Sequence, residues 1–157
     1  METQLISLIA SFFIFAGYVT YIYSKFGVLK SISKSYYELR PKNKWMFTIA
    51  LWGFSIPMII AGDTALMFLA GSAICFVGAA PAYKDSMTDK VHVAGAVAGI
   101  VLGAAAMWIN YGFWWITGLM ALSAFLMSHF EIKNETWWIE ITEFMFIFLG
   151  VLLSIIR

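Results

Sequence analysis

Two carboxylates near the end of the chain are the strongest candidates for chemistry. Glu140 and Glu143 follow a pair of tryptophans, and the residues after them are almost all apolar. Ionisable side chains are costly to bury in a membrane, so they are treated first as functional candidates. Their i, i+3 spacing places both on one helix face, where they would share a proton or recruit a cation. Alternatively, both reach the membrane interface and bind Lys or Arg there.

Two histidines are expected at the same level as these carboxylates. His92 falls in the first turn of one predicted helix and His129 in the last turn of another. His92 joins Glu140 and Glu143 as a proton or cation candidate, and all four side chains are the candidates for a divalent metal such as zinc. No HxxxH or HxxE spacing connects them locally. We therefore predict neither a metal nor a cofactor, and an interfacial histidine bonded to a neighbouring group is the alternative.

A polar segment, LKSISKSYYELRPKNKW, interrupts the apolar sequence. Its apolar residues follow helical spacing and its first lysines lie away from them, which predicts a short helix in the headgroup plane, within an amphipathic loop over 24–44. Lysines on such a helix would face anionic lipid. The candidate residues for binding a lipid headgroup or another anion are Lys30, Ser31, Ser33, Lys34, Tyr36 and Tyr37. Alternatively, the segment is only a basic anchor, or its hydroxyls turn inward toward the carboxylates.

These candidates must be positioned by helices that cross a membrane. Hydrophobic residues make up 62% of the chain and charged residues only 12%, against about a quarter charged in soluble proteins. A net charge of +1 gives no reason to expect a nucleic-acid partner. Since a bilayer core needs roughly 20 apolar residues, we predict an all-α, polytopic bundle of six transmembrane helices in one domain, 1–157. The predicted spans are 5–23, 45–61, 64–81, 91–109, 113–130 and 137–156.

The first span resembles a signal peptide only in its apolar core. It lacks a basic region before that core and a cleavage site of small residues, so we interpret it as a retained helix.

The cations predict the orientation of this bundle. Of the ten Lys and Arg residues, only Arg157 lies outside the first, third and fifth connections. These connections hold Lys25, Lys30, Lys34, Arg40, Lys42, Lys44, Lys84, Lys90 and Lys133. Because such residues stay in the cytoplasm when they flank short loops, both termini should be non-cytoplasmic and the protein should lie in the cytoplasmic (inner) membrane. Trp45, Trp137 and Trp138 should mark the inner interface.

Small residues indicate how two of the helices pack. Gly95, Gly99 and Gly103 recur every four residues, and small residues let membrane helices approach closely. The preceding helix has small residues at the same spacing, namely Gly71, Cys75 and Ala79. We expect these two faces to meet within the chain, and the alternative is that the glycine face packs against a second copy in a homo-oligomer.

The segments SISKSYY, CFVGAAPAYKD and KVHVAGA resemble a group of small, uncharacterised bacterial membrane proteins with an S-I-S-x-x-Y-Y loop and a V/L-H-x-x-G/S-A helix start. The resemblance covers residues 30–96, and the layout is similar to that of the broad six-helix group that includes the DRAM-like proteins. It implies six helices and no established activity. The residues on the shared pattern are Ser31, Ile32, Ser33, Tyr36, Tyr37 and His92.

Three functions are compatible with these residues. The first is a small integral membrane protein that binds a lipid headgroup, an anion or a partner at its cytoplasmic face. The second is a proton- or cation-coupled transporter or channel that uses Glu140 and Glu143. The third is a metal-dependent membrane hydrolase, although ceramidase-type hydrolases place several histidines around zinc and this chain has only two. Binding to membrane lipids is favoured over catalysis, and no catalytic residue is assigned.

Overall fold

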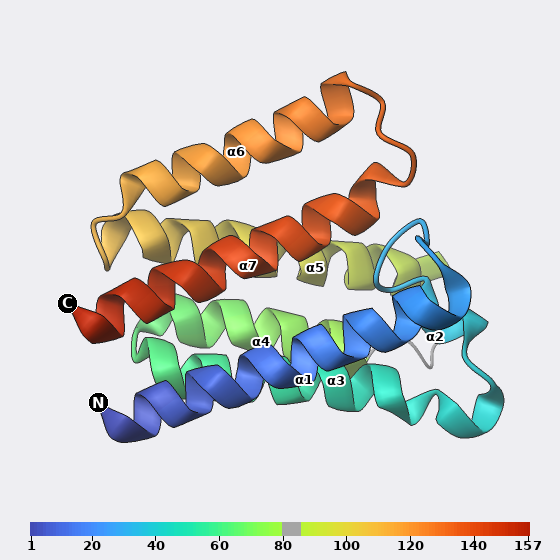
Figure 1. Ribbon diagram of the computed structural model, residues 1–157, viewed down its shortest axis with the longest axis horizontal. Helices are drawn as coiled ribbons and strands as arrows, with labels where there is room; N and C mark the ends of the chain where they lie inside the picture. Colours follow the sequence, from blue (N-terminus) through green and yellow to red (C-terminus); the bar gives the residue numbers. More distant parts are fainter. Residues whose placement is uncertain (80–85) are drawn as a thin grey trace.

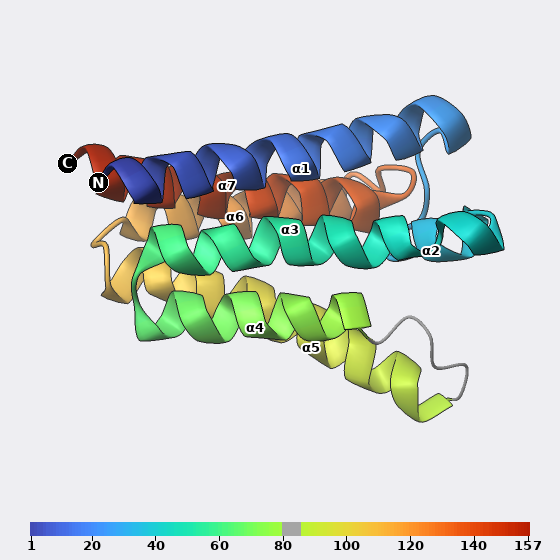
Figure 2. The same ribbon diagram turned by 90° about the horizontal axis from the view of Figure 1, so that it is seen from below.

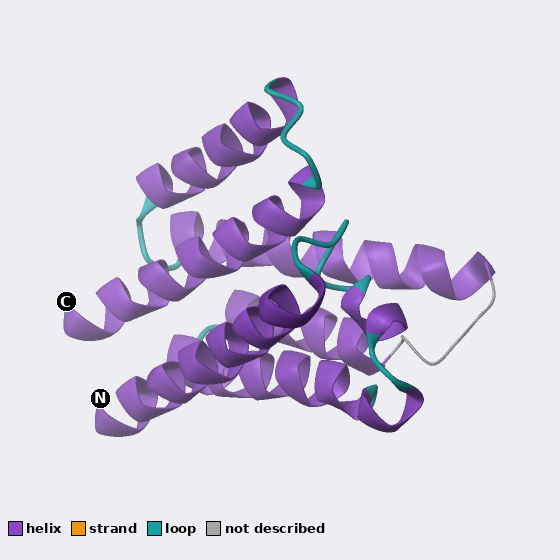
Figure 3. Ribbon diagram, turned by 45° about the vertical axis from the view of Figure 1, so that its right-hand side comes forward, coloured by secondary structure: helices purple, strands orange, loops and turns teal. Residues whose placement is uncertain are grey.

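The computed structural model describes residues 1–79 and 86–157, and the side chains of 86–89 are not described. The predicted helix end at Pro81 and the cation Lys84 therefore lie outside the described residues. The long helices are α1 (Glu2–Phe26), α3 (Trp45–Gly62), α4 (Ala65–Ala79), α5 (Ser86–Ile109), α6 (Trp114–His129) and α7 (Glu135–Ile156). A single turn, α2 (Ser35–Glu38), and a 3-10 turn, η1 (Pro41–Asn43), lie between α1 and α3. The described part is all-α, with loops and turns between the helices (Figure 3).

The long helices run side by side and alternate in direction along the chain (Figure 1). Both termini lie at one end of the bundle, which we call the terminal end (Figure 2). The opposite end, the cap end, carries residues 27–44, which we call the cap segment, and the connection 130–134 between α6 and α7. The two ends of the molecule therefore present different connections to their surroundings.

Among the residues that the structure describes, four helices are long and apolar enough to cross a membrane. They are Glu2–Phe26, Pro41–Gly62, Lys90–Ile109 and Glu135–Ile156, and Ala65–Ala79 is a shorter apolar helix. Large apolar side chains also point outward, among them Phe13, which is 68% exposed, and Phe125, which is 62% exposed. Exposed apolar surface on this scale is expected where lipid surrounds the helices. The prediction of a helical protein compatible with a membrane is confirmed.

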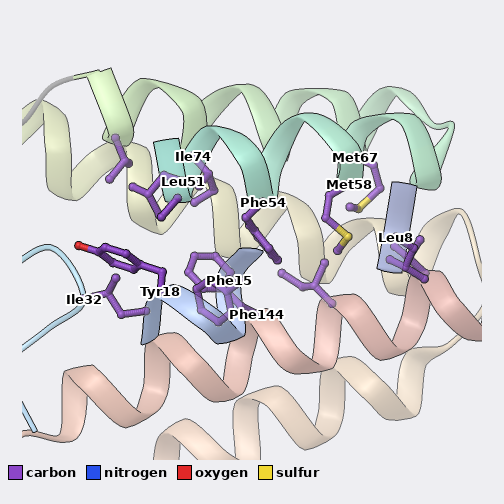
Figure 4. Packing of buried hydrophobic residues seen from close by; sticks show 14 of the residues in the cluster. Leu8, Phe15, Tyr18, Ile32, Leu51, Phe54, Met58, Met67, Ile74 and Phe144 are labelled. Atoms are coloured by element: carbon purple, nitrogen blue, oxygen red, sulfur yellow. The ribbon is translucent and has the colours of Figure 1, made fainter. Parts of the chain in front are cut away.

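An aromatic cluster joins α1, α3 and α7 at the centre of the core (Figure 4). The ring of Phe54 lies 5.0 Å from the rings of both Phe15 and Phe144, and Phe15 meets Phe144 edge-on at 5.2 Å. Such tilted and edge-on contacts are favourable beyond the burial of area alone. Beside them the Ser11 hydroxyl donates to the Phe54 carbonyl at 2.8 Å. This cluster fixes α7, and with it the two candidate carboxylates, against the first two long helices.

The glycines of α5 pack within the chain. A Cβ at Gly95 or Gly99 would lie 3.3 or 3.4 Å from a backbone carbonyl of α4 and closer still to a branched side chain of that helix. Gly103 instead faces Ile147 of α7. The expected contact between α4 and α5 is therefore present, and the glycine face is covered by the chain's own helices.

The prediction that the α4 face with Gly71, Cys75 and Ala79 meets α5 was wrong. Gly71 packs against Ile59 of α3, and the Cys75 carbonyl accepts a hydrogen bond from the indole of Trp52, also on α3, at 2.8 Å. Helix α4 contacts both α3 and α5, and Gly71 and Cys75 serve the contact with α3. The face toward α5 is formed by Ala70, Ala73, Ile74 and Val77.

Two features near the cap end shape the candidate site. Trp137, expected at the membrane interface, is only 1% exposed and belongs to the core, whereas Trp45 and Trp138 are exposed. Toward the cap end α6 diverges from α5 (Figures 1 and 3), and the buried residues of α6 are Ile116 and Met120, in its first two turns. The start of α7 is thus held by the core while the end of α6 stands apart.

Candidate functional site

Glu140 holds the cap segment against the bundle. Its Oε2 accepts the backbone N–H of Ile32 at 2.5 Å, across 108 positions of sequence. Ile32 itself is only 3% exposed. A backbone N–H that is buried without an acceptor costs about 1–3 kcal/mol. The carboxylate therefore supplies the acceptor that the bent backbone at Ile32 lacks.

His92 and Tyr18 fasten the cap segment at two further points. His92 Nε2 lies 2.6 Å from the Ser33 hydroxyl, and the imidazole stacks on Phe47 of α3 with ring centres 6.5 Å apart. The Ser35 hydroxyl donates to the Ile32 carbonyl at 2.5 Å and lies 2.6 Å from the Tyr18 hydroxyl. A hydroxyl has one proton to donate, so Tyr18 is the donor in the second contact.

Asn134, in the connection between α6 and α7, provides a fourth attachment. Its side-chain Nδ2 donates to the Val28 carbonyl at 2.9 Å. Together with the bonds to Ile32, Ser33 and Ser35, this ties the first half of the cap segment to α1, α5, α7 and the α6–α7 connection. The segment is folded onto the bundle end.

The prediction of an amphipathic helix in the headgroup plane was wrong for most of the cap segment. Only Ser35–Glu38 is α-helical, and Ile32 and Leu39 are buried in the bundle at 3% exposure each. The helical spacing of the apolar residues was a misleading signal for a longer helix. Val28 and Ile32 precede α2, and there the Ile32 N–H donates to Glu140 and the Val28 carbonyl accepts from Asn134. The apolar side chains point into protein.

The predicted ligand-binding residues separate into two groups. Ser33 is bonded to His92, Ser31 Oγ accepts the Lys34 backbone N–H at 3.2 Å, and Tyr36 packs on Phe47 with ring centres 5.9 Å apart. These three have structural partners. Lys30, Lys34 and Tyr37 remain exposed.

The outer surface of the cap segment is basic. Its exposed cations are Lys30, Lys34, Arg40 and Lys42, and Lys44 is half-buried. The Lys44 ammonium lies 4.5 Å from the ring centre of Tyr36, and the Lys34 ammonium 5.4 Å from that of Tyr37. Contacts between a cation and an aromatic face restrain lysines without neutralising them. The surface therefore combines free positive charge with aromatic rings at one end of an apolar bundle.

Glu143 has a different environment from Glu140. It is 3% exposed, and its Oε1 lies 3.4 Å from the Ser123 hydroxyl, which is closer, at 2.8 Å, to the Met120 carbonyl. A bond of 3.4 Å is beyond the usual range for hydroxyl donors. The second oxygen, Oε2, is buried without a hydrogen-bond partner among the described residues. Glu140 and Glu143 thus have separate surroundings and do not share a bonding group.

The metal candidates do not converge. No group of three or more His, Cys, Asp or Glu side chains that could hold a metal is found among the described residues, which include His92, His129, Glu140 and Glu143. His129 stacks on Phe125 at 5.6 Å at the diverging end of α6, while His92 lies against the cap segment. His92, His129, Glu140 and Glu143 are therefore not brought together as a metal site in the described part of the chain.

Sequence reasoning missed three side chains that build this region: Tyr18, Ser123 and Asn134. The signal available for Tyr18 and Ser123 was a polar group inside an apolar run, since such groups need partners in a membrane. Asn134 takes the left-handed conformation, with φ 60°, just before α7 begins. That conformation suits Asn, but nothing local indicates its bond to Val28.

The chain finds no match among protein-family models, curated proteins or solved structures. The function must therefore be argued from the geometry of the cap end and of the two carboxylates.

Proposed function

We propose that this protein is a six-span integral membrane protein whose cap segment binds anionic lipid headgroups at the cytoplasmic face of the inner membrane. The observation that carries the proposal is the division within the cap segment. Its apolar and hydroxyl side chains are fastened inward, while four cations remain exposed on its outer surface. Basic residues at a membrane surface contribute about 1 kcal/mol each toward anionic lipid.

Three further points support this arrangement. Four helices have the length and apolarity for spanning, and α4 and α6 run beside them in alternating directions (Figure 1). The cap end holds most of the cations, and the positive-inside rule assigns such an end to the cytoplasm. Lys34 and Lys44 are also positioned by the aromatic rings of the cap segment, so less side-chain entropy is lost when a headgroup binds.

The proposal is tested by measuring lipid binding to the purified full-length protein. We expect Lys34→Gln combined with Lys42→Gln to lower affinity for phosphatidylglycerol about thirtyfold, since each lysine contributes about 1 kcal/mol. Native mass spectrometry in detergent measures the affinity at low salt. The matched control is Arg157→Gln, which removes one cation at the terminal end and should leave the affinity unchanged. Equal affinity for phosphatidylglycerol in the double variant and the unaltered protein would refute the proposal.

Glu143 favours a second candidate function, that of a proton- or cation-coupled transporter or channel. The observation is the buried Oε2 atom without a partner among the described residues. An acidic side chain kept at membrane depth without a full set of hydrogen bonds is expensive, which gives reason to look for a proton or cation that occupies the site. Proton or cation flux into proteoliposomes should then be abolished by Glu143→Gln and unaffected by Glu38→Gln, an exposed residue of the cap segment. Flux that is insensitive to Glu143→Gln, or absent, excludes this candidate.

A further inference from the structure

The connection between α6 and α7 forms an open pocket of about 440 Å³ at the cap end. Its walls come from the last turn of α6, the first turn of α7, the residues between them and Lys30 of the cap segment. The charged lining residues are Lys30, Glu131 and Glu135. This pocket adjoins the cap segment but is built mainly by other elements.

The charges of the pocket are not paired with one another. No ion pair or hydrogen bond joins the ammonium of Lys30 to Glu131 or Glu135 in the part of the chain that the structure describes. A positive and two negative groups held apart around one pocket complement a ligand that itself carries separated charges of both signs. A simple anion would meet the carboxylates, and a simple cation would meet the lysine.

Two hydroxyls extend this complementarity. Ser128 and Thr136 face the same pocket, and their side-chain oxygens have no hydrogen-bond partner in the described part of the chain. Hydroxyls and an ammonium are donors that suit phosphate oxygens, whereas carboxylates are acceptors that suit a protonated amine. The pocket lining therefore provides donors that suit a phosphate, among them Lys30, and acceptors that suit an amine, Glu131 and Glu135.

The type of amine follows from the lining. Quaternary ammonium groups are recognised by cages of aromatic faces, and the pocket has no aromatic residue among its described lining residues. A primary ammonium instead donates three hydrogen bonds, which Glu131 and Glu135 can accept. A serine headgroup adds a carboxylate, which these glutamates would repel.

The apolar surroundings indicate that the ligand is a lipid. Ile132 lines the pocket and is 40% exposed, and the adjacent Phe130 is 69% exposed. Exposed apolar side chains beside a polar pocket suit acyl chains that continue from a headgroup. We propose that this pocket binds the phosphoethanolamine headgroup of a membrane phospholipid. The inference relies on the proposed function only for placing the cap end at a membrane surface.

The experiment measures binding of phosphatidylethanolamine and phosphatidylcholine with identical acyl chains to the full-length protein in detergent, by native mass spectrometry. We expect phosphatidylethanolamine to bind about fivefold more tightly, as befits partly exposed charge pairs. Glu131→Gln and the double variant Glu131→Gln, Glu135→Gln should remove this preference. The single variant leaves Glu135, the first residue of α7, unchanged, so the start of that helix is not altered. Glu38→Gln, which lies outside the pocket, should keep the preference.

Equal binding of the two lipids, or a preference that survives in the double variant, would overturn the inference. In a third arm, soluble glycerophosphoethanolamine is added as a competitor of phosphatidylethanolamine. If it displaced the lipid at an equal concentration, the ligand would be a free metabolite and not a lipid. Lys34→Gln with Lys42→Gln separates the two proposals. This double variant should lower phosphatidylglycerol binding and leave the preference for phosphatidylethanolamine intact. Loss of that preference would show that the headgroup binds the cap lysines, and would overturn the assignment of the pocket as its binding site.

Discussion

At the residue scale, Glu140 and Glu143 show how two glutamates of one helix take different roles. Glu140 accepts a backbone N–H from the cap segment, whereas Glu143 is buried beside Ser123 with one oxygen unpartnered in the described chain. The first arrangement stabilises a loop. The second leaves a polar atom whose burial is not offset by a good hydrogen bond.

Glu140→Ala tests the structural role of the first carboxylate. The substitution leaves the Ile32 N–H buried without its acceptor, which costs about 1–3 kcal/mol. We expect a lower midpoint of thermal unfolding in detergent and faster amide hydrogen exchange across the cap segment. Glu140→Gln keeps an acceptor and should lose less stability, and Glu38→Ala, at an exposed position, should change neither measurement. If Glu140→Ala behaved like Glu38→Ala, the bond to Ile32 would not fasten the cap segment.

Residue types alone identified Glu140, His92 and Ser33 as groups that could meet, but not how they meet. The Ile32 amide lies 108 positions from Glu140 and the Ser33 hydroxyl 59 positions from His92. Such pairings depend on how the helix ends are placed, which no local pattern contains. One alternative read from the sequence was that these hydroxyls turn inward toward the carboxylates. Ser33 and Ser35 do bond inward, but their partners are His92 and Tyr18 and not the glutamates.

At the element scale, the helices were predictable and the cap segment was not. Long apolar runs in a membrane satisfy their backbone groups internally as helices, so Leu5 to Tyr23 lies within α1 and Trp45 to Ala61 within α3. In the cap segment, residues 34–37 and 39 bond to backbone carbonyls three or four residues earlier, while the Ile32 N–H and the Val28 carbonyl bond to side chains of other elements. The helical spacing of its apolar residues therefore predicted correctly that Ile32 and Leu39 are buried, but predicted a longer helix than the turn Ser35–Glu38 that forms.

Gly99→Leu tests the contact between α4 and α5. The new Cβ would lie 2.4 Å from an atom of Ile74 and 3.4 Å from the Ala70 carbonyl, so the helices must separate, at a cost of about 1–3 kcal/mol. Gly118→Leu is the matched control, because nothing lies within 4 Å of a Cβ at that exposed position of α6. Thermal unfolding in detergent should show a loss for Gly99→Leu only. Equal midpoints for the two variants would contradict the close approach of α4 and α5.

At the scale of the whole molecule, the proposed orientation rests on the distribution of charge and on the positive-inside rule. The cap segment carries five cations, and the terminal end carries the C-terminal residue Arg157. Moving a lysine or arginine to the centre of a membrane costs about 2.5–3.5 kcal/mol, so translocating the cap segment is far more costly than translocating either terminus. The alternation in helix direction brings the turn 110–113 to the terminal end.

Labelling of single cysteines tests this orientation and the number of spans together. In a Cys75→Ser background, Thr3→Cys and Asn110→Cys should react with a membrane-impermeant maleimide added to intact cells, and Lys42→Cys should react only after permeabilisation. All three positions are exposed, so access is decided by the side of the membrane. Labelling of Lys42→Cys in intact cells would reverse the orientation. Protection of Asn110→Cys with labelling of Thr3→Cys would show that fewer than six helices cross, because the α5–α6 turn would then lie on the same side as the cap segment.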